Sequence, residues 1–182
     1  KERSPYFVLA EGELESLVGG VKGLACRHCG CVGTLNRHGR LRTKAGEVRG
    51  VRLWCCPRRK GNPGCGRSLS IWLAGVIPGH SVSAQALDCF LRAWAMLGGD
   101  IQAAWQEART GFSIDSAYRW VKRFVRNQGG IRSRLCRVRA PPRACSKWVH
   151  AQLFGHLQAV FGAKSFTINY QMHFQRPWPM RA

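Results

Sequence analysis

The sequence predicts an α+β fold with three parts. These are a small antiparallel sheet built around a metal, a three-helix segment, and a C-terminal helix followed by a strand. Three observations support this prediction. Two pairs of cysteines flank strand-like segments in the first half of the 182-residue chain. Residues 83–126 repeat apolar side chains at helical spacing, and residues 165–175 alternate apolar and polar side chains, which is typical of a strand.

The cysteine pairs have the form of metal-binding knuckles. In each pair the last cysteine precedes a glycine, which takes a positive φ in a tight turn without steric cost. Two thiol pairs separated by about thirty residues suit one tetrahedral zinc ion with four sulfur ligands. We therefore expect a zinc ribbon over residues 23–75 that holds one zinc ion per chain, with ligands Cys26, Cys29, Cys56 and Cys65.

Cys55 is an alternative to Cys56 as a ligand of this set. Cys55 and Cys56 are adjacent, and only one of them should face the metal. Cys56 is favoured, because Trp54 then lies two residues before the ligand on the same face of the strand. His28 and Cys31 are spare donors near the first pair. The ribbon strands are expected at residues 34–38, 48–54 and 68–72.

Three helices are expected in the middle of the chain, at residues 84–97, 101–108 and 114–126, after the capping residues Ser83, Asp100 and Ser113. A short glycine-bearing turn between the last two helices describes a helix-turn-helix, which we place at residues 80–127. The inner face of the third helix would be Ile114, Ala117, Trp120, Val121 and Phe124. Its outer face would be Asp115, Ser116, Arg119, Lys122, Arg123 and Arg126. The alternative is a plain helical bundle with a solvated basic face.

The charge of the chain indicates a polyanionic partner. The net charge is +20, and it is concentrated in two blocks. Residues 23–72 hold eleven basic residues and one acidic residue, and residues 131–182 hold nine basic residues and none that are acidic. This distribution is typical of nucleic-acid binding. The chain has no apolar run long enough to span a membrane, and its nine cysteines favour a reducing compartment. We therefore expect a cytoplasmic location at the bacterial nucleoid.

Three further segments complete the predicted organisation. Residues 1–22 form an acidic arm with a short helix that packs against the ribbon. Residues 128–147 read as an extended basic arm or linker. Residues 148–182 form a helix and a strand, and the strand would add to the edge of the ribbon sheet or of a homodimer rather than to a foreign partner. Trp178 would be an apolar anchor at the end of this tail.

A family resemblance rests on four of these motifs. The first knuckle, the segment GTLNRHGRLR, the closing CGRS and the helix AYRWVKRF together resemble the N-terminal DNA-binding region of insertion-sequence transposases. They are also similar to the small stand-alone regulators of such elements. The resemblance covers residues 23–126, and it implies binding to the terminal repeats of a mobile element. It assigns base reading to Ser116, Arg119 and Arg123, places Tyr118 beside the DNA backbone, and gives the metal role to Cys26, Cys29, Cys56 and Cys65.

The acidic residues that such a transposase needs for catalysis are missing. A two-metal site for phosphoryl transfer requires acidic ligands, and no Asp or Glu follows Asp115. We therefore expect a double-stranded DNA-binding protein without a catalytic site of its own, which works with a recombinase or transposase partner. Two alternatives are an RNA-binding zinc-ribbon subunit of a ribonucleoprotein and a DNA-binding fragment of a transposase whose nuclease domain is elsewhere.

The expected nucleic-acid contacts lie in the ribbon, the third helix and the basic arm. Phosphate contacts position the protein, and base contacts specify the sequence. In the ribbon the expected contacts are Arg37, Arg40, Arg42, Arg58, Arg59 and Lys60. In the third helix they are Ser116, Tyr118, Arg119, Lys122, Arg123 and Arg126, and in the arm they are Arg132, Arg134, Arg137 and Arg139.

Overall fold

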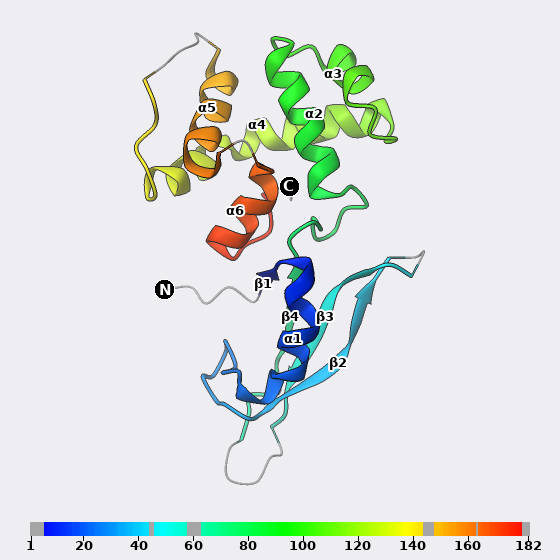
Figure 1. Cartoon of the computed structure of the whole chain (residues 1–182), viewed down its shortest axis with the longest axis vertical. Helices are drawn as coiled ribbons and strands as arrows, with labels where there is room; N and C mark the ends of the chain where they lie inside the picture. Colours follow the sequence, from blue (N-terminus) through cyan, green and yellow to red (C-terminus); the bar gives the residue numbers. More distant parts are fainter. Residues whose placement is uncertain (1–5, 44–45, 58–62, 144–147, 163, 180–182) are drawn as a thin grey trace. The chain divides into compact units, whose positions relative to one another are not determined.

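The structure is a computed structural model that describes residues 6–43, 46–57, 63–143, 148–162 and 164–179. Its elements form an α+β fold with a four-stranded sheet and six α-helices among these residues (Figure 1). The chain divides into two units. The first unit, which holds the sheet, comprises Lys1–Ser81 and Gln171–Pro177, and the second, which is helical, comprises Val82–Tyr170 and Trp178–Ala182.

The sheet of the first unit has the strand order β1-β4-β3-β2. Strands β2, β3 and β4 are antiparallel neighbours, so the three predicted ribbon strands are confirmed. Strand β1 was not predicted. It pairs in parallel with β4, more than sixty residues away, and a four-residue strand has too little alternation to be recognised alone. The strands are β1 Tyr6–Leu9, β2 Leu35–Arg42, β3 Val48–Cys55 and β4 Ser68–Leu73.

One face of the sheet is covered by α1, Leu14–Gly19, which lies between two 3-10 turns, η1 Glu11–Glu13 and η2 Val21–Gly23 (Figure 1). Leu14 and Val18 of α1 are buried in one cluster with Val51, Leu53 and Ile71 of the sheet. The predicted short helix packing against the ribbon is therefore confirmed. The small size of this cluster leaves the unit with little apolar stabilisation of its own.

The second unit consists of helices that begin at the predicted caps. The hydroxyl of Ser83 accepts a hydrogen bond from the Ala86 N–H at 3.1 Å, and the Asp100 carboxylate accepts one from the Ala103 N–H at 3.0 Å. Ser113 caps the following helix in the same way. The helices are α2 Ala84–Met96, α3 Ile101–Ala108, α4 Ile114–Cys136, α5 Val149–Phe161 and α6 Phe166–Phe174.

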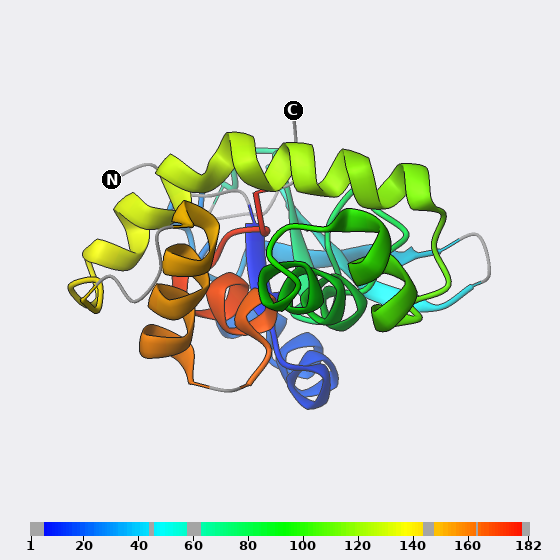
Figure 2. The same ribbon diagram turned by 90° about the horizontal axis from the view of Figure 1, so that it is seen from above.

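Helix α4 is longer than predicted, and Figure 2 shows it as one continuous helix. The prediction of an extended arm from residue 128 is wrong for residues 128–136, which are the last turns of α4. Gly129 and Gly130 argue locally against a helix. However, Gln128, Ile131 and Leu135 are buried and continue the helical stripe at spacings of three and four residues, so tertiary packing prevails over the local propensity.

The predicted strand over residues 165–175 is also wrong, because Phe166–Phe174 is helix α6. Its buried residues are Phe166, Thr167, Tyr170 and Gln171, which is helical spacing. Two of these four are polar. The alternation that indicated a strand therefore arose because half of the buried stripe consists of hydrogen-bonded polar side chains.

Those polar side chains find partners within the fold. The side chain of Asp88 on α2 accepts hydrogen bonds from the hydroxyls of Ser165 and Thr167 and from the Thr167 backbone N–H, the last at 3.2 Å. It thereby caps the first turn of α6 from 79 residues away in the sequence. In the first unit, the Gln171 amide donates to the carbonyls of Ala74 and Val76 at 2.8 and 3.0 Å.

The core of the helical unit is aromatic. Phe124 of α4 lies 5.9 Å from Trp94, 5.3 Å from Phe154 and 6.3 Å from Trp178, measured between ring centroids. Trp178 is 2% exposed, so its predicted role as an apolar contact is confirmed. Leu97, the last residue of the predicted helix, is the C-cap residue and is exposed.

Candidate metal centre and basic surfaces

Four thiols of the first unit converge on one point. The Sγ atoms of Cys26, Cys29, Cys55 and Cys65 all lie within 4.8 Å of one another. The Sγ–Sγ distance is 3.8 Å between Cys26 and Cys65 and 3.7 Å between Cys29 and Cys55. A tetrahedron of sulfurs about 2.3 Å from a central zinc ion has edges of about 3.8 Å. The arrangement could therefore hold a metal ion.

The backbone of the first pair forms a tight knuckle. The Cys26 N–H donates to the Cys31 carbonyl at 2.9 Å, and the Gly30 N–H donates to the Cys26 carbonyl at 2.7 Å. Gly30 has a φ of 80°, as predicted for a glycine that closes such a turn. The knuckle turns the thiols of Cys26 and Cys29 toward the end of β3.

The second pair is built at the junction of β3 and β4. The Gly66 N–H donates to the Cys55 carbonyl at 2.9 Å, and Gly66 has a φ of 70°. Gly64 is required for a different reason. A Cβ atom there would lie 2.5 Å from the Cys55 Sγ and 2.6 Å from the Cys56 carbonyl oxygen. The close passage of the chain over Cys55 therefore depends on the absence of a side chain at residue 64.

The fourth thiol corrects the predicted ligand set, since Cys55 occupies the position assigned to Cys56. Side chains alternate along β3, and Leu53 and Cys55 are fully buried on the face covered by α1. Trp54 and Cys56 are half-buried and belong to the other parity. The prediction placed the metal on the tryptophan side of the strand, whereas the converging thiols lie on its core side. The other three predicted ligands are brought together.

Neighbouring polar groups orient the buried thiol of Cys55. The Thr34 hydroxyl lies 3.2 Å from the Cys55 Sγ, and the Cys65 N–H donates to that sulfur at 3.3 Å. Such contacts fix the orientation of a metal ligand. Burial raises the pKa of the Cys26 thiol to about 12, whereas hydrogen bonding by the Cys31 backbone lowers the pKa of Cys29 to about 6. Metal binding would displace the proton from Cys26.

The two spare donors lie near the converging thiols, and each also contacts a backbone carbonyl. The Cys31 thiol donates to the Pro63 carbonyl at 3.6 Å, and the His28 Nε2 lies 3.3 Å from the Ser68 carbonyl oxygen. Neither belongs to the converging group. The donor set is thus four sulfurs, which suits a soft or borderline metal such as zinc.

Helix α4 carries the predicted division between a buried and an exposed face. Ala117, Trp120, Val121 and Phe124 are buried, as expected, whereas Ile114 is half-buried. On the opposite side Tyr118 is 53% exposed. Among the other predicted contacts of this helix, Arg119, Lys122 and Arg126 are exposed, and Ser116 and Arg123 are half-buried.

Three of the predicted arm cations are used inside the helical unit. Arg132 donates to the carbonyl of Val149, and Arg134 donates to the hydroxyl of Tyr170 at 3.1 Å. Arg139 donates to the Ala159 carbonyl in the last turn of α5 at 2.8 Å. A cation at the C-terminal end of a helix also interacts favourably with the helix dipole. These residues join α4 and the segment after it to α5 and α6. Arg137 is exposed.

The cations of the sheet unit differ in their availability. Arg37 and Arg42 on β2 are exposed, and Arg40 forms an ion pair of 2.9 Å with Glu15 of α1. Arg58, Arg59 and Lys60 lie outside the described residues. Arg52 and Arg67 are exposed and were not predicted as contacts. The alternation of β3, which puts Arg52 opposite the buried Val51 and Leu53, could have identified Arg52 from the sequence.

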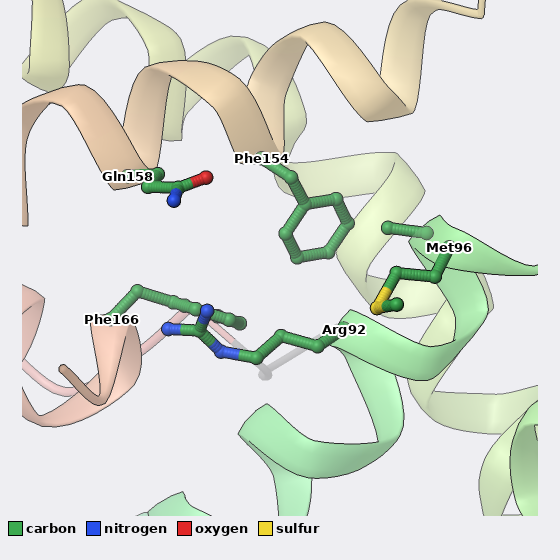
Figure 3. Close-up of a pocket in the computed structure, with 6 residues that line it drawn as sticks. Arg92, Met96, Phe154, Gln158 and Phe166 are labelled. Carbon is green, nitrogen blue, oxygen red and sulfur yellow. The ribbon is translucent and has the colours of Figure 1, made fainter. Parts of the chain in front are cut away.

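A hollow of about 270 Å³ lies between α2, α5 and α6 of the helical unit (Figure 3). The guanidinium of Arg92 lies 5.1 Å from the centre of the Phe166 ring and donates to the Lys164 carbonyl at 2.7 Å. The hollow is slightly smaller than usual for small-molecule sites. Its lining is mainly apolar and consists of Arg92, Ala95, Met96, Phe154, Gln158 and Phe166.

Comparisons of the chain with protein-family models, curated proteins and solved structures give no match. The resemblance to transposase DNA-binding regions therefore stays a prediction. Among the described helices, none combines the length and apolar character required to cross a bilayer.

Proposed function

We propose that the chain is a zinc-dependent protein that binds double-stranded DNA. In this proposal the first unit is a zinc ribbon, and α3, the turn after it and α4 form a helix-turn-helix. The observation that carries the proposal is the two-sided character of α4. Its buried stripe leaves an opposite face on which Tyr118, Arg119, Lys122 and Arg126 are exposed.

The charge of α4 supports this assignment. The helix has six basic residues and one acidic residue, Asp115. Between residues that the structure describes, the one ion pair is Arg40–Glu15, so Arg119, Lys122 and Arg126 have no carboxylate partner there. Uncompensated like charges along one helix destabilise the free protein. A phosphate backbone would offset that repulsion and release its counterions.

The turn before α4 supports a fixed presentation of this face. Arg109 and Gly111 have φ values of 44° and 73°, which reverse the chain after α3. The Trp105 Nε1 donates to the Phe112 carbonyl at 2.6 Å, and the Phe112 ring lies 4.0 Å from that of Trp120. These contacts hold the first turns of α4. In helix-turn-helix proteins, the N-terminal residues of the second helix meet the base edges.

The metal has a structural role in this proposal. Zinc bound by Cys26, Cys29, Cys55 and Cys65 would supply a crosslink between the first knuckle and the end of β3, one ion per chain. The four thiols leave no open coordination position for a substrate. The chain would bind the ends of a mobile element at the bacterial nucleoid and leave strand cutting to a recombinase or transposase partner.

The proposal is tested by selecting a preferred site from random duplex DNA and measuring affinity at two salt concentrations. Arg119→Ala should weaken the selected site about tenfold or more and relax its sequence preference, because a base contact is lost. Arg137→Ala is the matched control, since it removes an exposed cation that lies beyond the predicted recognition turns. It should weaken all sequences slightly and equally.

Equal losses for both variants on every sequence would contradict the recognition role of α4. Competition by structured RNA that exceeds competition by the selected duplex at the same salt concentration would favour the RNA-binding alternative. A selected site with inverted-repeat symmetry at element ends would support the mobile-element assignment.

A further inference from the structure

The face of the sheet that α1 does not cover has an unusual composition. Residues of β3 and β4 alternate between the buried cluster and this outer face. Arg52 and Ser68 are exposed there, and Trp54 and Trp72 are half-buried. We define the outer face as Asn36, Arg52, Trp54, Ser68, Ser70 and Trp72, none of which is acidic.

The strand register places its aromatic and basic residues in order. Trp54 pairs with Ser68, Arg52 with Ser70, and Gly50 with Trp72. Trp54 and Trp72 are therefore four residue positions apart along the strands, or about 13 Å, and Arg52 lies midway between them. Two rings separated by one guanidinium form a row along the β3–β4 pair.

A hydrogen bond from the ring nitrogen of Trp54 fixes the orientation of its ring. Its Nε1 donates to the Gly66 carbonyl at 3.1 Å, beside the second cysteine pair. The His38 ring lies 6.4 Å away on β2, and the Asn36 side chain, opposite Trp54 in the register, donates to the Thr34 carbonyl at 3.1 Å. A fixed aromatic ring that remains partly exposed loses little rotamer freedom when another ring stacks on it.

We propose that the outer face binds a single-stranded segment of DNA, whose bases stack on Trp54 and Trp72 while Arg52 contacts the phosphate between them. Aromatic side chains next to cations on an open sheet are the means by which proteins bind unpaired strands without reading sequence. The absence of acidic residues on this face and the net charge of +20 make it complementary to a polyanion. The inference rests on the proposed function only in taking DNA as the polymer.

The test measures binding of the zinc-loaded full-length chain to labelled oligothymidine of about twelve nucleotides, by fluorescence anisotropy. Trp54→Ala should weaken single-strand binding about tenfold, and Trp54→Phe should stay within about threefold of the parent because a ring remains. Arg119→Ala should weaken the selected duplex and leave single-strand affinity within about threefold. Zinc content and circular dichroism establish that each variant is folded.

A crosslinking measurement separates contact from a merely structural effect. An oligonucleotide that carries 5-bromodeoxyuridine should crosslink under ultraviolet light to peptides that contain Trp54 or Trp72, as mapped by mass spectrometry. Crosslinks confined to α4, or equal losses of duplex and single-strand binding in folded Trp54→Ala, would overturn the inference. Tighter, Trp54-dependent binding of RNA of the same sequence would overturn the choice of DNA. If duplex selection fails while these results hold, only the proposed function of α4 fails.

Discussion

The two units of this chain are built in different ways. The sheet unit has one short helix over a four-stranded sheet, and four thiols converge at the end of β3. The helical unit packs α2 to α5 and the first residues of α6 around aromatic rings such as Phe124 and Trp94, and the described part of it holds no such cluster of thiols. If the thiols hold a metal ion as proposed, stability depends on that ion in one half of the chain and on packing in the other.

The largest expected effect is the response of the sheet unit to loss of metal. A structural zinc site contributes on the order of 10 kcal/mol to folding, which exceeds what so small a core supplies. We expect a chelator, or Cys55→Ser, to unfold β2, β3 and β4 while the helices remain. Amide hydrogen exchange of each strand and helix, with zinc content per chain, measures both effects.

Cys56→Ser is the matched control, because Cys56 is adjacent to the proposed ligand Cys55 and lies outside the converging thiols. It should keep one zinc ion per chain and protect the strands as the parent does. Loss of zinc from Cys56→Ser with retention in Cys55→Ser would show that the assignment from the geometry is reversed. Equal exchange in the strands and the helices after chelation would remove the contrast between the units.

Much of this contrast could be predicted from the sequence, because local signals define it. Ser83, Asp100 and Ser113 begin the three middle helices as expected, since a capping side chain acts within three residues of itself. The first cysteine pair is equally local, because Cys26 and Cys29 belong to one turn. Cys65 was predicted from the glycine that follows it, so three of the four converging thiols were identified from the sequence.

The predictions were wrong where residues far apart in the sequence determine the local structure. Cys55 and Cys56 differ only in which face of β3 they occupy, and that depends on the side on which α1 packs. Helix α6 was mistaken for a strand because Asp88, far away in the sequence, satisfies the polar side of its buried stripe. The packing of α1 on β3 and the hydrogen bonds of Asp88 to α6 produce no periodic pattern in β3 or α6. The periodicity of those segments alone therefore could not predict the ligand or the helix.

Asp88 is a buried carboxyl group that connects α2 to the start of α6 by hydrogen bonds. Asp88→Ala removes the acceptor of two hydroxyls and of the Thr167 N–H. Leaving buried donors without an acceptor should destabilise this unit by about 2–3 kcal/mol. The first turn of α6 should lose hydrogen-exchange protection before the rest of the unit, while zinc content stays unchanged. Uniform loss of protection in both units would contradict this local role.

The pH dependence provides a separate test of the same carboxyl group. Burial raises the pKa of Asp88 from 3.8 to about 6, because the charged form is poorly solvated. The folded state then binds the proton more tightly than the unfolded state. This contribution is fully present below pH 3.8 and is lost as the pH rises through about 6. Relative to Asp88→Asn, the parent should lose up to about 3 kcal/mol of unfolding free energy over that range.

The smallest expected effect lies on the surface of the sheet unit, in the Arg40–Glu15 ion pair. The side chains are 37% and 70% exposed, so water and salt screen the attraction. Glu15→Gln should change the stability of the zinc-loaded unit by less than about 1 kcal/mol. It should also release Arg40 for phosphate contact and slightly increase the affinity for DNA. A double-mutant cycle with Arg40→Ala measures the coupling, and a value several times larger would mean that this ion pair, and not the apolar packing of Leu14 and Val18, holds α1 on the sheet.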